Sequence, residues 1–431
     1  MKKALIITYY WPPSGGAGVQ RWLKFVKYLR EFGWEPIVYT PQNPEYPAID
    51  HSLEKDIPKN LTVLKTSINE PYSLYKRFVG RKKSDPIKAG FLSEKKNPSI
   101  TEKISVWIRG NFFIPDARMF WIKPSIRFLT DYLKNKPVDV IISTGPPHSM
   151  HLIAKGVKEK TGIPWLADFR DPWTNIDFYP DLMLTTRADQ KHHLLEREVL
   201  KSADSVVVIS DGMKADFNRI YPRKYEVITN GFDEDDVPSV LKPKGKNFTI
   251  SHIGSLVKTR NPETFWQALQ KMVVQDQQFA GDLKIRLVGK TDWTVRESLK
   301  KFQLESFVDF IDYLPHNEVV QEQASADVLL LLINQTPNAK MILTGKFFEY
   351  MASGKPILCI GPEDGDAARI TRETEIGLVA GFEDQEKMEK QIAALYRNHM
   401  ENRVFKPTGT ITDYSRRNLT KILTAKLSAI S

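Results

Sequence analysis

A stretch in the last third of the chain combines a turn, a lysine and a carboxylate in a pattern that suits a phosphate-bearing ligand. Gly345 and Lys346 precede a helix expected over residues 347–353, and Gly354 stands where a helix C-cap favours a positive φ. Glu349 then falls within about the first turn, near backbone N–H groups that have no acceptor inside the helix. The turn and its lysine would bind phosphate, and the glutamate would bind hydroxyls. An ordinary strand connection is the alternative.

A second cationic loop starts at Ser255, directly after an expected strand. Lys258 and Arg260 stand immediately before a helix that Asn261 and Pro262 are expected to cap. A cation at this end of a helix opposes the helix dipole unless an anion binds there. The pattern therefore predicts an anion site.

Near the start of the chain a glycine-rich loop separates a strand expected at residues 3–10 from a helix expected at 19–32. Gly15, Gly16 and Gly18 do not match the spacing of the dinucleotide-binding fingerprint, and no Walker lysine follows. A tight turn needs one glycine, so three neighbours favour close approach of the backbone to a ligand.

Three further polar residues, His148, Arg170 and Asp171, fall in loops after expected strands of the same sheet. Carboxyl ends of parallel strands share one edge, where such sheets bind ligands. Taken singly each could be structural, and Asp171 could begin a turn before Pro172.

These loops are positioned by two sets of alternating strands and helices, which predict two doubly wound, Rossmann-like α/β domains facing across a ligand cleft. At 431 residues the chain exceeds one ordinary core. We expect an N-terminal domain of residues 1–238 plus a terminal helix within 413–431, and a C-terminal domain of residues 246–412. The acidic run between them is interpreted as a solvated hinge, not as a metal-binding D-x-D element.

Composition predicts a globular cytoplasmic protein. The hydrophobic fraction is 41%, no apolar run reaches the length of a membrane span, and no signal peptide precedes the first strand. The single cysteine, Cys359, is expected to pack in the core. The net charge of +10 permits nucleic acid, an anionic membrane face or a phosphorylated ligand as partner. Nucleic acid comes last, because no recognition module for it is present.

Much of the excess charge lies in residues 76–110, which hold ten Lys and Arg but only three acidic residues. Aromatic residues are interleaved with these charges, which indicates an insertion that touches the inner face of the plasma membrane or a lipid-linked substrate. A solvated face with ordinary core anchors is the equal alternative.

With these motifs in hand, the chain resembles the family 4 retaining glycosyltransferases of the GT-B fold, and most of all those of bacterial surface-polysaccharide assembly. The resemblance covers nearly the whole chain, and the stretches that carry it are YWPPSGGAGVQR at 10–21, STGPPHS at 143–149, PWLADFRDPW at 164–173, VITNGF at 227–232, HIGSLVKTRNPE at 252–263 and GKFFEYMASGKPIL at 345–358.

The resemblance implies roles for individual residues. Gly15 and Gly16 would approach the donor diphosphate, which Arg260 would contact with Lys346 beside it. Glu349 would hold the nucleotide ribose. Tyr313 and Leu314 would lie near the nucleotide base, and Ser255 in the donor loop.

Two positions depart from the family pattern: Met341 replaces the first glutamate of the paired-glutamate motif, and Arg170 stands where many members have a histidine.

The expected reaction is sugar transfer from a nucleoside-diphosphate sugar to a lipid-linked or saccharide acceptor, without a metal ion or other cofactor. Cations and amides would stabilise the departing diphosphate, while His148, Arg170 and Asp171 would orient acceptor and sugar. The alternatives are a nucleotide-sugar epimerase on the same fold and an inactive member that binds glycan or membrane in an assembly complex.

Overall fold

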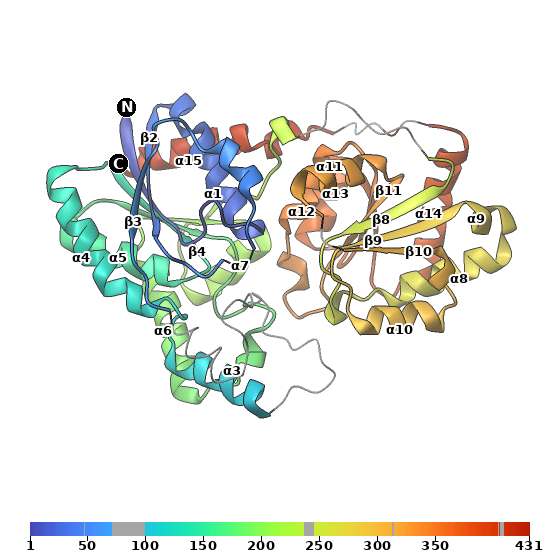
Figure 1. Cartoon of the computed structure of the whole chain (residues 1–431), viewed down its shortest axis with the longest axis horizontal. Helices are drawn as coiled ribbons and strands as arrows, with labels where there is room; N and C mark the ends of the chain where they lie inside the picture. Colours follow the sequence, from blue (N-terminus) through green and yellow to red (C-terminus); the bar gives the residue numbers. More distant parts are fainter. Residues whose placement is uncertain (47, 71–99, 237–244, 313, 404, 406–408) are drawn as a thin grey trace. The chain divides into compact units, whose positions relative to one another are not determined.

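A computed structural model describes residues 1–46, 48–70, 100–236, 245–312, 314–403, 405 and 409–431. These residues form two compact units (Figure 1): Met1–Thr229 with Arg416–Ser431, and Asn230–Ser415. Each unit is described by itself below. Most of the segment 76–110 and the residue Tyr313 lie outside the described residues.

The described part of the first unit contains one sheet of seven parallel strands in the order β3-β2-β1-β4-β5-β6-β7. The strands are β1 Lys2–Ile7, β2 Trp34–Pro41, β3 Thr62–Thr66, β4 Val140–Gly145, β5 Trp165–Phe169, β6 Ser205–Val208 and β7 Glu226–Val227. The helices are α1 Ala17–Leu29, α3 Ile100–Phe112, α4 Met119–Asn135, α5 Ser149–Thr161, α6 Thr186–Ser202, α7 Asp211–Ile220 and α15 Arg416–Ile430.

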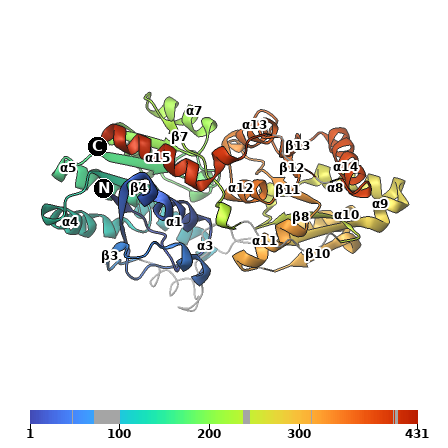
Figure 2. The same ribbon diagram turned by 90° about the horizontal axis from the view of Figure 1, so that it is seen from above.

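The terminal helix α15 belongs to this first unit and runs alongside α1 (Figure 2). Its leucines Leu419, Leu423 and Leu427 recur every four residues and are buried in the same core as Trp22 and Val26 of α1. The chain therefore leaves the first unit, forms the second, and returns to complete the first.

The second unit contains a sheet of six parallel strands in the order β10-β9-β8-β11-β12-β13. The strands are β8 Phe248–Ile253, β9 Leu283–Val288, β10 Val308–Ile311, β11 Val328–Leu332, β12 Ile357–Ile360 and β13 Gly377–Ala380. The helices are α8 Glu263–Gln275, α9 Gln277–Asp282, α10 Trp293–Lys301, α11 His316–Ser325, α12 Gly345–Ala352, α13 Asp366–Glu373 and α14 Gln385–Met400.

Both faces of this second sheet are covered by apolar helices. Along β11, Leu330 packs in a core with helices α8, α10 and α14, while Leu329 and Leu331 pack in another with α12 and α13. Successive strand residues point to opposite faces, so a strand buried on both sides must be apolar throughout. Cys359 is buried in the second of these cores, as expected of a packing residue.

Three local expectations need correction. Helix α12 begins at Gly345, two residues early, because Thr344 is the extended N-cap; Glu349 therefore lies in the second turn. Asn261 does not cap α8: the N-cap is Pro262, and the Asn261 amide instead donates to Ser298 Oγ over 2.8 Å. Strand β3 was not predicted, because a half-exposed edge strand of mixed polarity carries a weak signal.

Candidate functional site

The expected site residues of the first unit lie in loops at the carboxyl ends of β1, β4 and β5. Gly16, with a φ of 90°, forms the N-cap of α1, so the first-turn amides of that helix follow it directly. Gly15 is buried, and its amide donates to the Ala48 carbonyl over 2.8 Å. Of the two glycines, Gly16 therefore has the more open backbone.

The Arg170 guanidinium joins these loops by hydrogen bonds to their backbone carbonyls. Its Nε donates to the Gly145 carbonyl over 3.3 Å, and its two terminal nitrogens donate to the carbonyls of Gly18 and Pro146. The side chain is buried, and this burial lowers its pKa below the ordinary arginine value. Arg170 thus brings the glycine loop and the loop after β4 together.

His148 lies on the second of these loops, at the N-cap of α5. Its ring is buried and stacks on Trp173, with 4.5 Å between ring centroids. Burial lowers its pKa well below the ordinary value, and His151 nearby lowers it further, so the imidazole is neutral at pH 7. Asp171 has the opposite shift: burial raises its pKa to about 6, although Arg170 opposes this.

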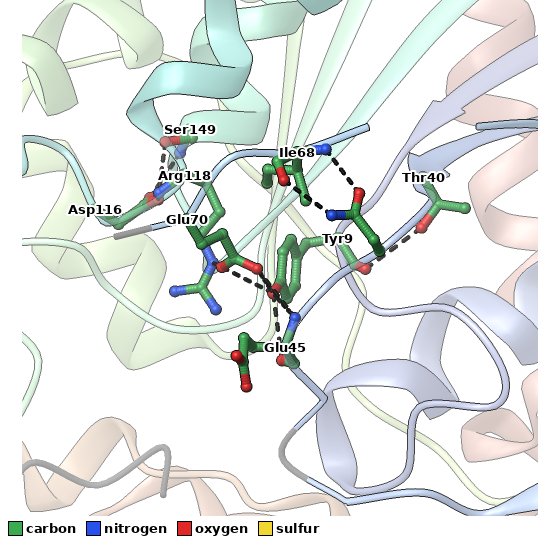
Figure 3. Close-up of polar contacts among 9 residues, drawn as sticks. Tyr9, Thr40, Glu45, Ile68, Glu70, Asp116, Arg118 and Ser149 are labelled. Carbon is green, nitrogen blue, oxygen red and sulfur yellow. Dashed lines mark hydrogen bonds and ion pairs between the residues drawn. The ribbon is translucent and has the colours of Figure 1, made fainter. Parts of the chain in front are cut away.

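A polar network beside His148 fixes the start of α5 (Figure 3). Asp116 accepts hydrogen bonds from the Ser149 amide over 2.9 Å and the Ser149 hydroxyl over 2.8 Å. Its neighbour Arg118 lies over the ring of Tyr9, 4.3 Å from the centroid, and forms an ion pair with Glu70 over 3.1 Å. The Tyr9 hydroxyl donates to the same carboxylate. The end of β1 is thereby tied to the loop before α5.

A buried ion pair in this unit was not anticipated. Arg21 Nη2 lies 2.7 Å from Asp168 Oδ1, and Asp168 also accepts from Trp22 Nε1 and Thr144 Oγ1. Burial alone would raise the pKa of Asp168, but the charge of Arg21 and the hydrogen bonds from Arg21, Trp22 and Thr144 together outweigh burial and lower that pKa. The sequence signal for this pair was Asp168, a charged residue inside an apolar strand, because a charged side chain is rarely buried without a partner.

In the second unit, Ser255 and Arg260 lie in the loop after β8. Arg260 Nε donates to Asn334 Oδ1 over 2.7 Å, and its Nη1 donates to the Ser255 carbonyl over 3.0 Å. Asn334 follows β11, so the arginine joins two neighbouring loops at the carboxyl edge of the sheet. Its orientation is fixed before any ligand binds.

Lys346 is the second residue of α12, in the helix turn where a cation is least favourable. Burial and the nearby charge of Arg260 lower its pKa to about 7, while Glu349 opposes this shift, so all three side chains share one electrostatic environment. Glu349 is half-buried and accepts a weak hydrogen bond from Gln323 Nε2 at 3.5 Å. Two crowded cations beside the N-terminal amides of Gly345 onward form a site that an anion would stabilise.

The remaining expected residues contribute less. Leu314 is half-buried and packs against the core that contains α12. Met341 is buried in a 3-10 turn before α12. Among the described residues, no group of three or more His, Cys, Asp or Glu side chains could hold a metal ion.

His252 at the end of β8 is a further residue that sequence reasoning left aside. It is buried, its Nδ1 donates to the Leu330 carbonyl over 2.9 Å, and burial together with Lys346 lowers its pKa well below the ordinary value. Its position just before the loop of Lys258 and Arg260 was the signal in the sequence that could have identified it.

Two family models match successive parts of the chain and together cover about two thirds of it. The model described as Glycosyltransferase Family 4 matches residues 90–236, and the one described as Glycosyl transferases group 1 matches residues 247–398. The chain belongs to these group 1 and family 4 glycosyltransferases, which transfer sugars from nucleotide-sugar donors without a metal ion.

Solved structures match the chain over its whole length at low identity. HepE from Anabaena, solved in complex with UDP-glucose, has a TM-score of 0.61 and 12% identity, covering 100% of both chains. WaaG, a glycosyltransferase involved in lipopolysaccharide biosynthesis, has a TM-score of 0.56 and 14% identity, covering 100% of this chain and 99% of its own. These likenesses show the fold, two parallel α/β sheets of the GT-B type.

The same fold occurs in a putative UDP-N-acetylglucosamine 2-epimerase from Listeria monocytogenes, with a TM-score of 0.51, 11% identity and coverage of 99% and 96%. No curated protein matches the sequence. Among the described residues, no helix is both long and apolar enough to cross a bilayer.

Proposed function

We propose that the chain transfers a sugar, with retention of anomeric configuration, from a nucleoside-diphosphate sugar to a lipid-linked or saccharide acceptor in the synthesis of a cell-surface polysaccharide. The observation that carries the proposal is the cation pair Arg260 and Lys346 at the N-terminus of α12. The second unit binds the donor in this proposal, and the first unit binds the acceptor.

The donor diphosphate acquires charge as the bond to the sugar breaks. Arg260, already oriented by Asn334 and the Ser255 carbonyl, and Lys346 with the α12 amides stabilise that charge. Glu349 binds ribose hydroxyls, and Leu314 lies near the base. The amides that follow Gly16 add main-chain donors from the first unit.

The acceptor hydroxyl attacks the sugar from the face that the diphosphate leaves, and its proton passes to the departing phosphate oxygen. The neutral His148 imidazole and the Asp171 carboxyl orient the acceptor by hydrogen bonds. Arg170 acts on them indirectly, because it holds their loops in place.

Helix α3 supports a lipid-linked acceptor and peripheral contact with the anionic inner face of the plasma membrane. Ile104, Trp107 and Phe112 are 43%, 39% and 63% exposed, and Lys103 beside them is also exposed. Exposed aromatic and apolar residues with a neighbouring cation are typical of helices that lie in a membrane interface.

The test is incubation with labelled nucleoside-diphosphate sugars, with and without a membrane extract that contains lipid-linked saccharides. A transferase releases the nucleoside diphosphate only when an acceptor is present, and the product keeps the anomeric configuration of the donor. An epimerase changes the sugar without acceptor and leaves the nucleotide attached. The proposal is contradicted if none of the donors releases nucleoside diphosphate, although other transferases can use acceptors from the same extract.

A further inference from the structure

The second unit contains an open pocket of about 500 Å³. None of the expected site residues lines it, but Lys258 and Asn261, which belong to the same loop as Arg260, do. It lies between the loop after β8 and helix α10. Every residue that lines it is polar: Lys258, Asn261, Glu263, Thr294, Glu297, Ser298, Lys301 and Gln335.

The floor of this pocket is a connected hydrogen-bond network. Asn261 Nδ2 donates to Ser298 Oγ over 2.8 Å, and Ser298 Oγ donates to Glu263 Oε1 over 3.2 Å. Glu263 in turn accepts from Lys301 Nζ at 3.1 Å. Asn261 is also held by Trp266 Nε1, which donates to its Oδ1 over 2.9 Å. The donors and acceptors are thus fixed in place.

The charges that line the pocket balance. Two lysines face two glutamates, and one of each, Lys301 and Glu263, already form an ion pair. An ionic ligand would therefore meet attraction and repulsion in similar measure. A neutral ligand with many hydroxyl groups can donate to the carboxylates and accept from the ammonium and amide groups at the same time.

The pocket is separate from the donor site. Helices α8 and α10 supply most of the pocket walls, and they cover one face of the sheet through residues such as Trp266 of α8 and Leu299 of α10. Helix α12, which carries Lys346 and Glu349, packs on the other face. The two sites meet at the loops after β8 and β11. There the Gln335 amide donates to the Thr259 carbonyl over 2.7 Å, next to the bond between Arg260 and Asn334.

We propose that this pocket is a second carbohydrate site, which binds one or two neutral sugar rings of a glycan. Its size, its lining of polar residues and its balanced charge all match a polyhydroxyl ligand. A sugar held there contacts Asn261 and Gln335, which flank Arg260 and Asn334. The proposal does not depend on which acceptor the enzyme uses.

The experiment measures saturation-transfer NMR signals of maltose, cellobiose, lactose and N-acetylglucosamine on the full chain. At least one of these sugars is expected to give a signal that saturates with concentration. Glu297 is exposed at the pocket wall, so Glu297→Trp fills the space on a surface position, and this variant should weaken binding by about tenfold or more; Glu297→Ala should weaken it less. Lys300→Trp is the matched control, because Lys300 is exposed on the same helix and does not line the pocket.

Four results would overturn the proposal. The first is the absence of a saturable signal from all four sugars. The second is equal binding by the wild type and Glu297→Trp. The third is loss of the signal when excess UDP is added, because the sugar would then occupy the donor site. Tighter binding of glucose 6-phosphate than of the neutral sugars would contradict the neutral class. None of these results depends on transferase turnover, so the proposed function can fail or stand separately.

Discussion

Lys346 lies directly over Gly254. A Cβ added to that glycine would be 2.5 Å from the lysine Nζ, and the glycine has a φ of 121°. Strand β8 is therefore followed directly by a residue whose lack of a side chain makes room for the cation. The close approach explains why a lysine of the first helical turn is so poorly solvated.

We expect Gly254→Ala to displace Lys346 and weaken binding of a nucleotide sugar by about tenfold or more. The control is Gly354→Ala in the same unit: Gly354 also has a positive φ, 68°, but an added Cβ meets nothing within 4 Å. Both variants carry a backbone penalty, of about 1–3 kcal/mol each. Calorimetric titration with UDP-glucose checks this, and equal affinities of the two variants would show that the contact does not matter.

Arg260→Ala should lower kcat by about 10² to 10³-fold, because it removes a preoriented cation from the developing charge of the leaving group. Arg296 provides the control, since it is exposed on α10 and lies over Phe310, 3.8 Å from the ring centroid, away from this loop. Steady-state release of nucleoside diphosphate is the measurement. Near-normal turnover by Arg260→Ala rules the assignment out.

The pKa of Lys346, about 7, predicts a pH dependence of donor binding. Binding of the diphosphate favours the charged amine, so the affinity is constant below pH 7 and falls as pH rises above it, by up to about tenfold per unit. Titrations with a nucleotide sugar from pH 6 to 9 test this, because its diphosphate does not ionise in that range. Lys346→Arg stays charged and should flatten the profile; a profile as steep as that of the wild type would assign the effect to another group.

Arg170→Lys should destabilise the first unit by about 1–3 kcal/mol, because an ammonium group cannot serve the carbonyls of Gly18, Gly145 and Pro146 together. Thermal unfolding of the variant should occur at lower temperature, with a proportionate loss of activity. An unchanged unfolding temperature with lost turnover would instead indicate direct participation in the reaction.

Glu196 predicts a pH dependence of stability. Burial raises the pKa of this carboxyl from 4.5 to about 7, although it accepts hydrogen bonds from Thr174 Oγ1 and the Trp173 amide. The unfolded chain loses the proton first, so the free energy of unfolding falls as pH rises from about 4.5 to 7. Glu196→Gln has no carboxyl to titrate at this position. Its free energy of unfolding, relative to that of the wild type, should therefore rise by roughly 2–3 kcal/mol between pH 5 and pH 8.

Urea unfolding of the first unit at several pH values is the measurement for Glu196. Glu198→Gln serves as control, because Glu198 lies on the same helix but is 41% exposed and paired with Lys155. A difference between Glu196→Gln and the wild type that does not change with pH would contradict the shifted pKa.

The sequence predicted the alternating strands and helices well where apolar runs are bounded by glycine or proline, as at β4, β8 and β9. It predicted the positive φ of Gly354 after its helix. It could not predict the pair Arg21 and Asp168, because their partnership joins positions 147 residues apart. Nor could it reveal that Gly15 and Arg170 form hydrogen bonds with backbone carbonyls, since such contacts depend on how loops pack.

Helix α15 has a consequence for how the protein is made. Its leucines complete the core around α1, yet they are synthesised after every residue of the second unit. On the ribosome the second unit, a continuous segment, can finish folding while the first still exposes the apolar stripe of α1 to solvent. Emergence of α15 is therefore the step that completes the core of the first unit.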